Sequence, residues 1–402
     1  MRVLRPTAGN GTCGLGSDYS FLVRRGRLDK VVIEFGAGYA CYDDASCDKA
    51  AAEQSFTDMK LLDDMSLDCR YWNRFIQGSV SEGLIDRTEK NNPVSDYTYI
   101  YAGYCTQDVH IGHQTTTYEA AGGYEGVVFN HLGEWNARIV LDYLKRELSP
   151  KEVLVTGCSA GAIAAGVYGS ELSTYYASRS PETTVKVLGD GFMALLTRDF
   201  MESALPNWGL GEAICGTVLD LGFLAGAEWL ADTDYGYYLW KGVKDQLALN
   251  GNGKLALVSS VDDSVQKNVV MEFAGSDNAD YYRNEAGLRI LSRASPEVAD
   301  SAFIYSGKTH CTNSLSTIMD DNLMDASEFK EAAKFIQAFF DDGSAPDNPY
   351  VCPTCNSEDQ TGCDGELGSG LLTDNCGNCP GLGDAGCEAP LPEWVSTCPG
   401  FS

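Results

Sequence analysis

The sequence is poor in long apolar runs, in basic residues and in histidine. No apolar run approaches the roughly 20 residues of a membrane-spanning helix, so no membrane span is expected. Lys and Arg total 29 against 57 Asp and Glu, which gives a formal net charge of −28. Nucleic acids and anionic membrane surfaces both favour basic proteins, so this balance argues against either partner. An uncharged or cationic substrate fits the charge better than a polyanion does.

The N-terminus lacks the apolar stretch of a secretory signal peptide over residues 1–6. We therefore expect either that a signal peptide was removed before this numbering or that the natural N-terminus lies upstream. Cysteine, by contrast, is plentiful, with 15 in the chain. Cytosolic enzymes rarely carry so many, which predicts disulfide bonds and a secreted, extracellular protein. The glycosylation sequon at Asn10 agrees with secretion.

The odd cysteine count leaves at least one thiol unpaired within the chain. Cys158 is the candidate, because it lies in a predicted strand-to-helix turn where a disulfide would be awkward. The cysteines are also unevenly spread, since seven fall within the last 57 residues.

Residues 1–345 alternate between short β-branched runs and helical patterns. This alternation predicts an α/β fold with a mostly parallel sheet covered by helices. Two helices are expected at 135–148 and 327–340, where apolar residues recur at steps of three and four. The expected strands are 31–35, 97–101, 153–155, 185–188, 255–258 and 302–305.

A polar linker at 341–349 precedes a small cysteine-rich tail, residues 346–402. Its apolar runs are too short for a core, so cross-links must hold it. Cys352, Cys355, Cys376 and Cys379 have the spacing of a four-thiolate zinc site. Three further cysteines and an acidic context favour disulfides over zinc.

The strongest motif is Gly157-Cys158-Ser159-Ala160-Gly161, between an apolar strand and a small-residue helix. This is the nucleophile elbow of α/β-hydrolases. A serine on so sharp a turn needs small residues two positions away on either side. Its hydroxyl then projects above the sheet, and the Ala160 amide faces the developing oxyanion.

A nucleophilic serine needs a base, and His310 is the one histidine of four that follows Ser159, as the order serine, acid, histidine requires. Asp190 and Asp263 both follow predicted strands, and the later position is the usual one for the acid. Asp262 is a near neighbour of the latter. A buried carboxylate would hold the imidazole in the required tautomer.

The second part of an oxyanion hole is expected in the glycine-rich turn 36–41, which follows an early strand. Small residues there let the backbone N–H groups of Gly38 and Tyr39 approach a tetrahedral intermediate.

Together these segments resemble the pectin acetylesterase/Notum family of carboxylesterases. The elbow is similar to that family's GCSAGG, and the turn 36–41 resembles its cysteine-terminated oxyanion turn. The stretch 104–112, YCTQDVHIG, resembles the family's YC-x-x-D-x-H-x-G. Residues 263–266 resemble its YDSWQ and 309–311 its AHC-like segment.

The resemblance implies a triad of Ser159, Asp263 and His310, with oxyanion donors at Gly38, Tyr39 and Ala160. It implies an acylated polysaccharide or acylated protein as substrate, with acetyl as the expected acyl group, and no cofactor or metal ion. The sequence departs from the family pattern at four positions, which puts the substrate in doubt: Ala37, Tyr39, Ala162 and Val265.

Two functional hypotheses remain. The first is an active serine carboxylesterase that works through an acyl-enzyme. The second is a catalytically weak protein of the same fold that acts as an extracellular binding or structural component, with the tail as its attachment. An esterase anchored to extracellular matrix through the tail is a third. The sequence does not address the oligomeric state.

Overall fold

The structure is a computed structural model. It describes residues 2–6, 11–53, 92–119, 126–210, 235–273, 275–311, 350–353 and 357–372, together with single positions such as Leu84, Phe335, Phe339 and Cys379. Glycosylation at Asn10 and the cysteines at 69, 215, 376, 387 and 398 fall outside these residues.

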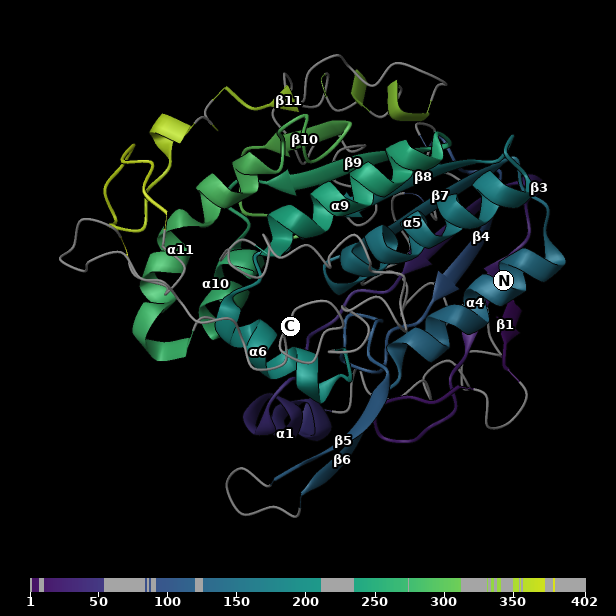
Figure 1. Cartoon of the computed structure of the whole chain (residues 1–402), viewed down its shortest axis with the longest axis horizontal. Coiled ribbons are helices and arrows are strands. Elements are labelled where there is room, and N and C mark those ends of the chain that lie inside the picture. The colour runs from purple at the N-terminus through teal and green to yellow at the C-terminus, as the bar shows by residue number, and fades with distance from the viewer. Residues whose placement is uncertain are drawn as a thin grey trace, which may run out of the picture.

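One large sheet organises the described chain (Figure 1). Its central strands pair in parallel, and the antiparallel pairs β1–β2 and β2–β4 lie at one edge. All six strands predicted from the sequence are present. In the described residues the order is β1 (Arg2–Leu4), β2 (Phe21–Arg24), β4 (Tyr97–Ala102), β3 (Arg27–Phe35), β7 (Glu152–Cys158), β8 (Thr184–Asp190), β9 (Gly253–Ser260), β10 (Ser301–Tyr305) and β11 (Tyr350–Val351).

Successive side chains of the strands point to opposite faces of the sheet and pack into two separate hydrophobic cores. Val31 and Ile33 pack on one face with helices α4 (Gly133–Glu147), α5 (Ala160–Arg179) and α9 (Tyr235–Asn250). Val32 packs on the opposite face against a second cluster. The central strands are buried on both faces, which is why they read as continuous apolar runs in the sequence.

The expected helices meet different outcomes. The one predicted at 135–148 is α4, two residues longer at its start and one shorter at its end. The one predicted at 327–340 lies largely outside the described residues, although Phe335, Phe339 and Phe340 are buried in the second core. The remaining described elements are α1 (Asp44–Glu53), α6 (Arg198–Asn207), α10 (Ser264–Phe273), α11 (Gly275–Ser292), the short helix η4 (Ser357–Asp359) and a separate ribbon of β5 (Gln114–Tyr118) and β6 (Val127–His131).

The cysteine-rich tail begins in contact with the main sheet. Its strand β11 pairs with β10, and the Cys352 amide donates to the Ile304 carbonyl. Disulfides join Cys352 to Cys355 and Cys363 to Cys379, so these sulfurs are not available as the zinc thiolates that their spacing allows. A domain boundary at residue 345 stays a prediction.

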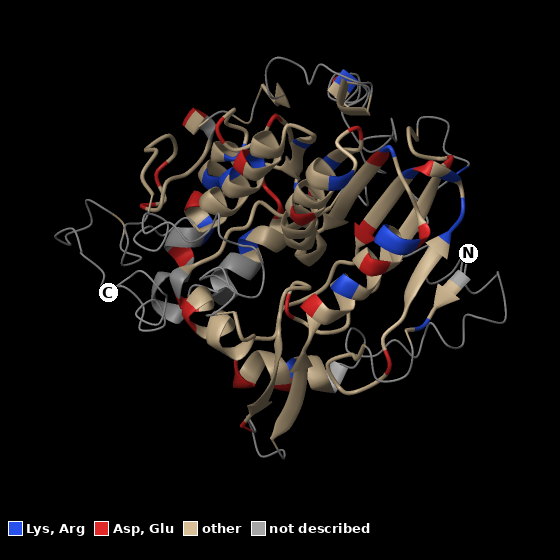
Figure 2. Cartoon of the chain, turned by 45° about the vertical axis from the view of Figure 1, so that its right-hand side comes forward, with Lys and Arg blue, Asp and Glu red and all other residues tan. Residues whose placement is uncertain are grey.

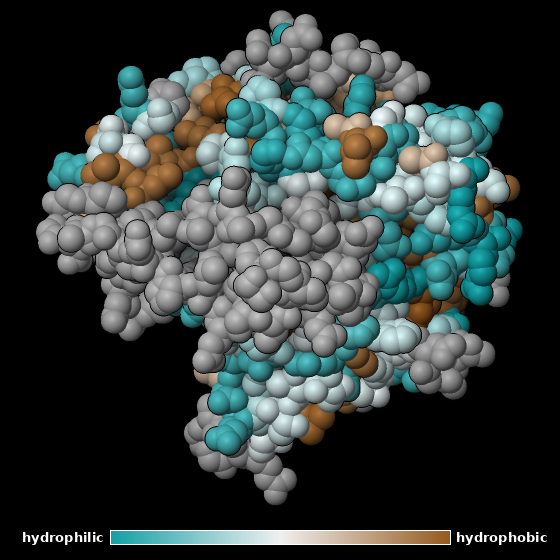
Figure 3. Space-filling model, in the orientation of Figure 1, coloured by the Kyte–Doolittle hydropathy of each residue, from teal (hydrophilic) through white to brown (hydrophobic). Residues whose placement is uncertain are grey.

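The described surface carries both charges. Figure 2 shows Asp and Glu residues spread among Lys and Arg residues over the helices and loops. On the face shown in Figure 3, hydrophilic residues surround smaller hydrophobic patches. Within the described ranges, none of the helices combines the length and apolarity that crossing a bilayer demands.

Candidate active site

The elbow serine sits on strained backbone between β7 and α5. Ser159 has φ 55° and ψ −123°, in a region that residues with a side chain rarely adopt. Its amide donates to the Asp190 carbonyl at 3.0 Å, which ties the turn to the end of β8. Such strain persists only where the surroundings enforce it, and it is concentrated at functional sites.

The two glycines of the motif are required by close backbone contacts. A Cβ on Gly157 would lie 2.3 Å from the Gly161 carbonyl oxygen, and one on Gly161 would lie 2.1 Å from the Phe35 carbonyl oxygen. Both distances are far below van der Waals contact. The turn therefore forms only because neither residue has a side chain.

Asp263 and His310 form a hydrogen-bonded pair at the carboxyl ends of β9 and β10. The imidazole Nδ1–H donates to both carboxylate oxygens of Asp263, at 2.9 and 3.1 Å. Asp263 is fully buried, whereas the His310 side chain is 16% exposed. With its proton on Nδ1, the ring keeps Nε2 as an acceptor.

The carboxylate is itself held by the start of α10. Its oxygens accept from the amides of Val265 and Gln266, at 2.9 and 3.0 Å, and from the Gln266 side chain at 2.9 Å. Four donors thus surround a buried charge, which is how a carboxylate is stabilised away from water.

The other carboxylates considered from the sequence lie elsewhere. Asp190 is buried at the end of β8, where its backbone carbonyl accepts a hydrogen bond from the Ser159 amide. Asp262 is half-exposed and forms an ion pair with Lys267. Of the carboxylates weighed for the acid, Asp263 is the one that the structure hydrogen-bonds to His310.

The expectation that Cys158 is an unpaired thiol is wrong. Cys158 is bonded to Cys311, with 5.7 Å between the two Cα atoms. Their separation of 153 residues hid the pairing, because the sequence alone does not show that the loop after β10 returns to the elbow. The bridge joins the residue before Ser159 to the residue after His310. A ring nitrogen of His310 lies within 4.8 Å of both sulfurs.

The glycine-rich turn lies against Tyr104. A Cβ on Gly38 would fall 2.3 Å from the Tyr104 ring, so this position too must be glycine. The Tyr104 hydroxyl donates to the Tyr39 carbonyl at 2.8 Å. The Tyr39 side chain, one of the departures from the family pattern, is 52% exposed at the surface of the turn.

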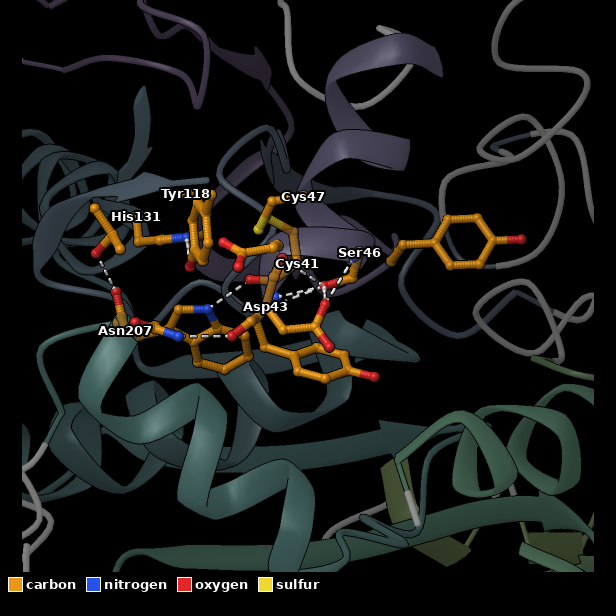
Figure 4. Close-up of a disulfide and its surroundings, with 12 residues drawn as sticks. Cys41, Asp43, Ser46, Cys47, Tyr118, His131 and Asn207 are labelled. Carbon is orange, nitrogen blue, oxygen red and sulfur yellow. Dashed lines mark hydrogen bonds between the residues drawn. A yellow bond between two sulfur atoms is a disulfide. The ribbon is translucent and has the colours of Figure 1, made fainter. Parts of the chain in front are cut away.

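The chain just after this turn is clamped on several sides (Figure 4). Cys41 forms a disulfide with Cys47, and Asp43 accepts a hydrogen bond from the Ser46 amide at 2.7 Å, at the start of α1. The Trp208 indole donates to the Cys41 carbonyl at 2.8 Å, and Asn207 donates to the Tyr42 carbonyl at 2.8 Å. The end of α6 therefore helps to fix the end of the turn.

Two groups of His and Cys side chains in the described residues lie close enough to share a metal ion. They are Cys41, Cys47 and His131, and Cys158, His310 and Cys311. In each group the sulfurs are joined in a disulfide and are not thiolate ligands.

Three buried residues around the site were not predicted to have a role in it. Asp108 and His110 belong to the stretch recognised only as a family-like motif. The Gln266 side chain bridges two groups. Its nitrogen donates to the Asp263 carboxylate, and its oxygen accepts a hydrogen bond from the Met193 amide at 2.7 Å. These polar side chains are visible in the sequence, but the sequence does not reveal their partners.

The family model described as pectinacetylesterase matches residues 2–204, half of the chain. The chain belongs to the pectinacetylesterase family. The match includes the turn 36–41 and the elbow, and it ends before Asp263 and His310. Family membership identifies the chain as a carboxylic ester hydrolase and confirms the resemblance inferred from the motifs.

The fold is shared with a solved member of the same group. The crystal structure of the Wnt deacylase Notum from Drosophila superposes with a TM-score of 0.53 at 16% identity, covering 77% of this chain and 85% of Notum. The predicted α/β-hydrolase fold is thus confirmed. No curated protein matches the chain.

Proposed function

We propose that this pectinacetylesterase-family chain is a serine carboxylesterase with Ser159, His310 and Asp263 as its triad. The observation that carries the proposal is the His310–Asp263 pair, tied to the strained serine elbow through Cys158–Cys311. The backbone amides of Gly38, Tyr39 and Ala160 are the proposed oxyanion donors. Ala160 opens α5, where the first N–H groups of a helix have no partner within the helix.

The geometry supports an acyl-enzyme mechanism. Ser159 Oγ attacks the ester carbonyl while His310 Nε2 takes its proton, and Asp263 stabilises the resulting imidazolium. The oxyanion is held by backbone amides until the C–O bond to the alcohol breaks and His310 returns the proton to the leaving oxygen. Water, activated by the same histidine, then hydrolyses the acyl-enzyme and frees the acid.

The proposed substrate is an O-acyl ester of an extracellular glycan or protein, with acetyl as the acyl group expected from the sequence. The disulfides between described cysteines support a secreted enzyme, since such bonds persist in oxidising compartments. The acidic surface supports an uncharged acyl ester over a polyanion.

A longer acyl chain is the second candidate, and one cavity favours it. A pocket of about 50 Å³ is lined by apolar and aromatic side chains, most of them from α5, α6 and α9. Ile163 and Val167 of its lining are four residues apart on one face of α5, the helix that begins directly after Ser159. An apolar cavity along that face suits a hydrocarbon chain better than an acetyl group.

The test compares the wild type with Ser159→Ala on p-nitrophenyl acetate, butyrate and octanoate. Turnover should fall by about 10⁵-fold or more in the variant, as it does when the serine of a triad is removed. Equal rates in both proteins would refute the serine mechanism. A rise in kcat/KM with chain length would select the longer acyl group, and a fall would select acetyl.

The catalytically weak binding protein remains the alternative. A fluorophosphonate probe separates the two, because it labels only a serine that its own site activates. Stoichiometric labelling of the wild type at Ser159 supports the enzyme. Labelling no faster than that of a denatured control supports a binding or structural role.

A further inference from the structure

The proposed oxyanion turn is held by buried groups from residues 104–110. His110 Nε2–H donates to the Gly36 carbonyl at 2.9 Å, and the Tyr104 hydroxyl donates to the Tyr39 carbonyl at 2.8 Å. At the end of the turn, the Cys41 amide donates to the Gln107 carbonyl at 2.8 Å. Start, middle and end of the turn are thus bound to one segment.

The placing of these bonds matters because of peptide geometry. A trans peptide is planar, with its C=O and N–H groups pointing in opposite directions. Fixing the Gly36 carbonyl therefore fixes the plane that leads into the turn, and fixing the Tyr39 carbonyl fixes the plane that leaves it. The two proposed donors, the N–H groups of Gly38 and Tyr39, belong to the peptides between these planes.

The holding segment is itself under strain. Gln107, Val109 and His110 have φ values of 54°, 48° and 66°, in the left-handed region that favours glycine. Each such residue costs on the order of 1 kcal/mol, and more for a β-branched one like Val109. A run of this kind persists only when surrounding contacts determine the backbone completely.

The buried carboxylate of Asp108 supplies those contacts. It accepts from the Thr106 hydroxyl at 2.6 Å, the His110 amide at 3.1 Å and the Gly133 amide at 2.7 Å. The hydroxyl of Tyr104 also accepts from the Val109 amide at 2.8 Å. The carboxylate thus fixes the segment on which the His110 ring is mounted.

A histidine that is only a packed core residue would not need this arrangement. The His110 ring does pack against Phe35 and Tyr104, with ring centroids 5.2 and 4.5 Å away. Its Nε2–H, however, donates a hydrogen bond to the Gly36 carbonyl of the turn. Burial lowers the pKa of His110 to about 4, so the ring is neutral at physiological pH and donates without bringing a charge into the core.

We propose that His110 and Tyr104 are positioning residues of the oxyanion hole, which aim the amides of Gly38 and Tyr39 by anchoring the carbonyls on either side of them. This inference rests on the proposed esterase function and adds the groups that make its oxyanion turn rigid. Both side chains are buried. Each acts through the backbone of the turn.

The test compares His110→Gln with His110→Leu. Glutamine and leucine both lack β-branching and would adopt the same strained backbone at position 110. Only glutamine places an N–H donor near the position of His110 Nε2. His110→Leu should lower kcat for a p-nitrophenyl ester by about 10- to 100-fold, the effect of a misplacement of about 1 Å. KM should change little, and His110→Gln should recover most of the loss.

A transition-state readout separates positioning from general destabilisation. The affinity for a boronic acid, which forms a tetrahedral adduct with the serine, should fall in parallel with kcat/KM across the variants. The control is Thr183→Val, which removes a buried hydroxyl bond to the Pro150 carbonyl before β8 begins, away from the carboxyl ends of the strands. It should lower the melting temperature and leave kcat unchanged.

A folded His110→Leu with wild-type kcat would overturn the proposal, as would a His110→Gln that falls as far as the leucine variant. If neither His110 variant folds, Tyr104→Phe decides, because it removes only the hydroxyl bound to Tyr39 and Val109. It should lower kcat in the same way, and wild-type kcat there would again overturn the proposal. Failure of the esterase function itself shows separately, as equal turnover by the wild type and Ser159→Ala.

Discussion

The two halves of the candidate site are built by different means. The proposed oxyanion turn and the elbow, residues 36–41 and 157–161, depend on glycines that have no room for a side chain. There a Cβ on Gly38, Gly157 or Gly161 would meet other atoms at 2.1–2.3 Å. The proposed acid and base, Asp263 and His310, are held by hydrogen bonds to the Asp263 carboxylate and by a disulfide that spans 153 residues.

The difference teaches where each half is vulnerable. An atom added at one of these glycines should damage fold and activity together. Loss of one polar atom that holds Asp263 or His310 should lower activity while the fold survives. The predictions that follow separate fold from chemistry in each half.

The largest effect is expected from Gly161→Ala. The added methyl group would lie 2.1 Å from the Phe35 carbonyl oxygen, which belongs to the central strand β3 and cannot move aside cheaply. We expect little folded protein and no measurable esterase activity, although Ser159 is retained. Expression yield, circular dichroism and p-nitrophenyl acetate turnover measure this.

Gly251→Ala is the matched control for that change. It is the same substitution at φ 70°, with nothing within 4 Å of the new Cβ. It should cost only about 1–2 kcal/mol of stability, from the left-handed backbone alone, and should keep wild-type kcat. A folded, active Gly161→Ala would show that the elbow is not limited by backbone packing.

Asp263→Asn should separate chemistry from fold in the other half. The amide keeps the shape of the carboxylate but reverses the tautomer that it favours on His310, so kcat should fall by about 10⁴-fold. The fold should survive, with a loss of stability from the donors left facing an NH₂ group. Steady-state kinetics and thermal melting measure the two effects.

Asp262→Asn tests whether the neighbouring carboxylate contributes. Its ion pair with Lys267 is half-exposed, so its loss should change kcat less than twofold and stability by less than about 1 kcal/mol. If Asp262→Asn were the inactive variant and Asp263→Asn the active one, the assignment of the acid would be wrong.

The same contrast explains what the sequence predicts well. The strands and α4 follow from apolar periodicity, because burial on one or both faces leaves a local record. The elbow can also be recognised from the sequence, since its glycines lie two residues before and two residues after Ser159. Asp190 and Asp263 both follow strands, and the later position and the family resemblance favour Asp263. The packing of β9 beside β10 brings Asp263 to His310.

Long-range pairing leaves no such record. The Cys158–Cys311 bridge was missed because local reasoning about the tight turn made Cys158 look unsuited to a bond. The polar contacts of Asp108 and His110 were missed for a related reason. Their carboxylate and imidazole are visible in the sequence, but their partners Gly133 and Gly36 are 25 and 74 residues away.

The Cys158–Cys311 bridge should affect both stability and catalysis. Replacing both cysteines by alanine should cost about 2–4 kcal/mol of unfolding free energy, the usual range for a native disulfide. It should also lower kcat by roughly 10-fold or more, because the loop that carries His310 loses its tie to the elbow. Chemical denaturation and steady-state kinetics measure both.

The double variant Cys13→Ala with Cys105→Ala provides the comparison. Its bridge spans 92 residues rather than 153, so the loop-entropy contributions differ by only about 0.5 kcal/mol. Similar losses of stability, with kcat reduced only in the Cys158–Cys311 variant, would assign the bridge a positioning role. Unchanged kcat in both would leave it a purely structural bond.

An acid-dependent loss of stability is expected around the proposed oxyanion turn. Burial lowers the pKa of His110 and of His131 to about 4, so between pH 6.5 and 4 each binds a proton in the unfolded chain but not in the folded one. Unfolding free energy must then fall as the pH falls, by on the order of 3 kcal/mol for each histidine. Burial raises the pKa of Asp108 to about 6, which acts in the opposite direction, since the folded state binds that proton first.

The net expectation is therefore a loss of on the order of 3 kcal/mol between pH 7 and pH 4, because the Asp108 contribution offsets most of one histidine. The double variant His131→Asn with Tyr118→Phe removes one histidine together with the hydroxyl that donates to it. Urea denaturation across this pH range should show its slope of free energy against pH reduced by up to about 1.4 kcal/mol per unit, the value for one proton. A slope equal to that of the wild type would mean that His131 is protonated in the folded state, and burial would then not be what keeps this cluster neutral.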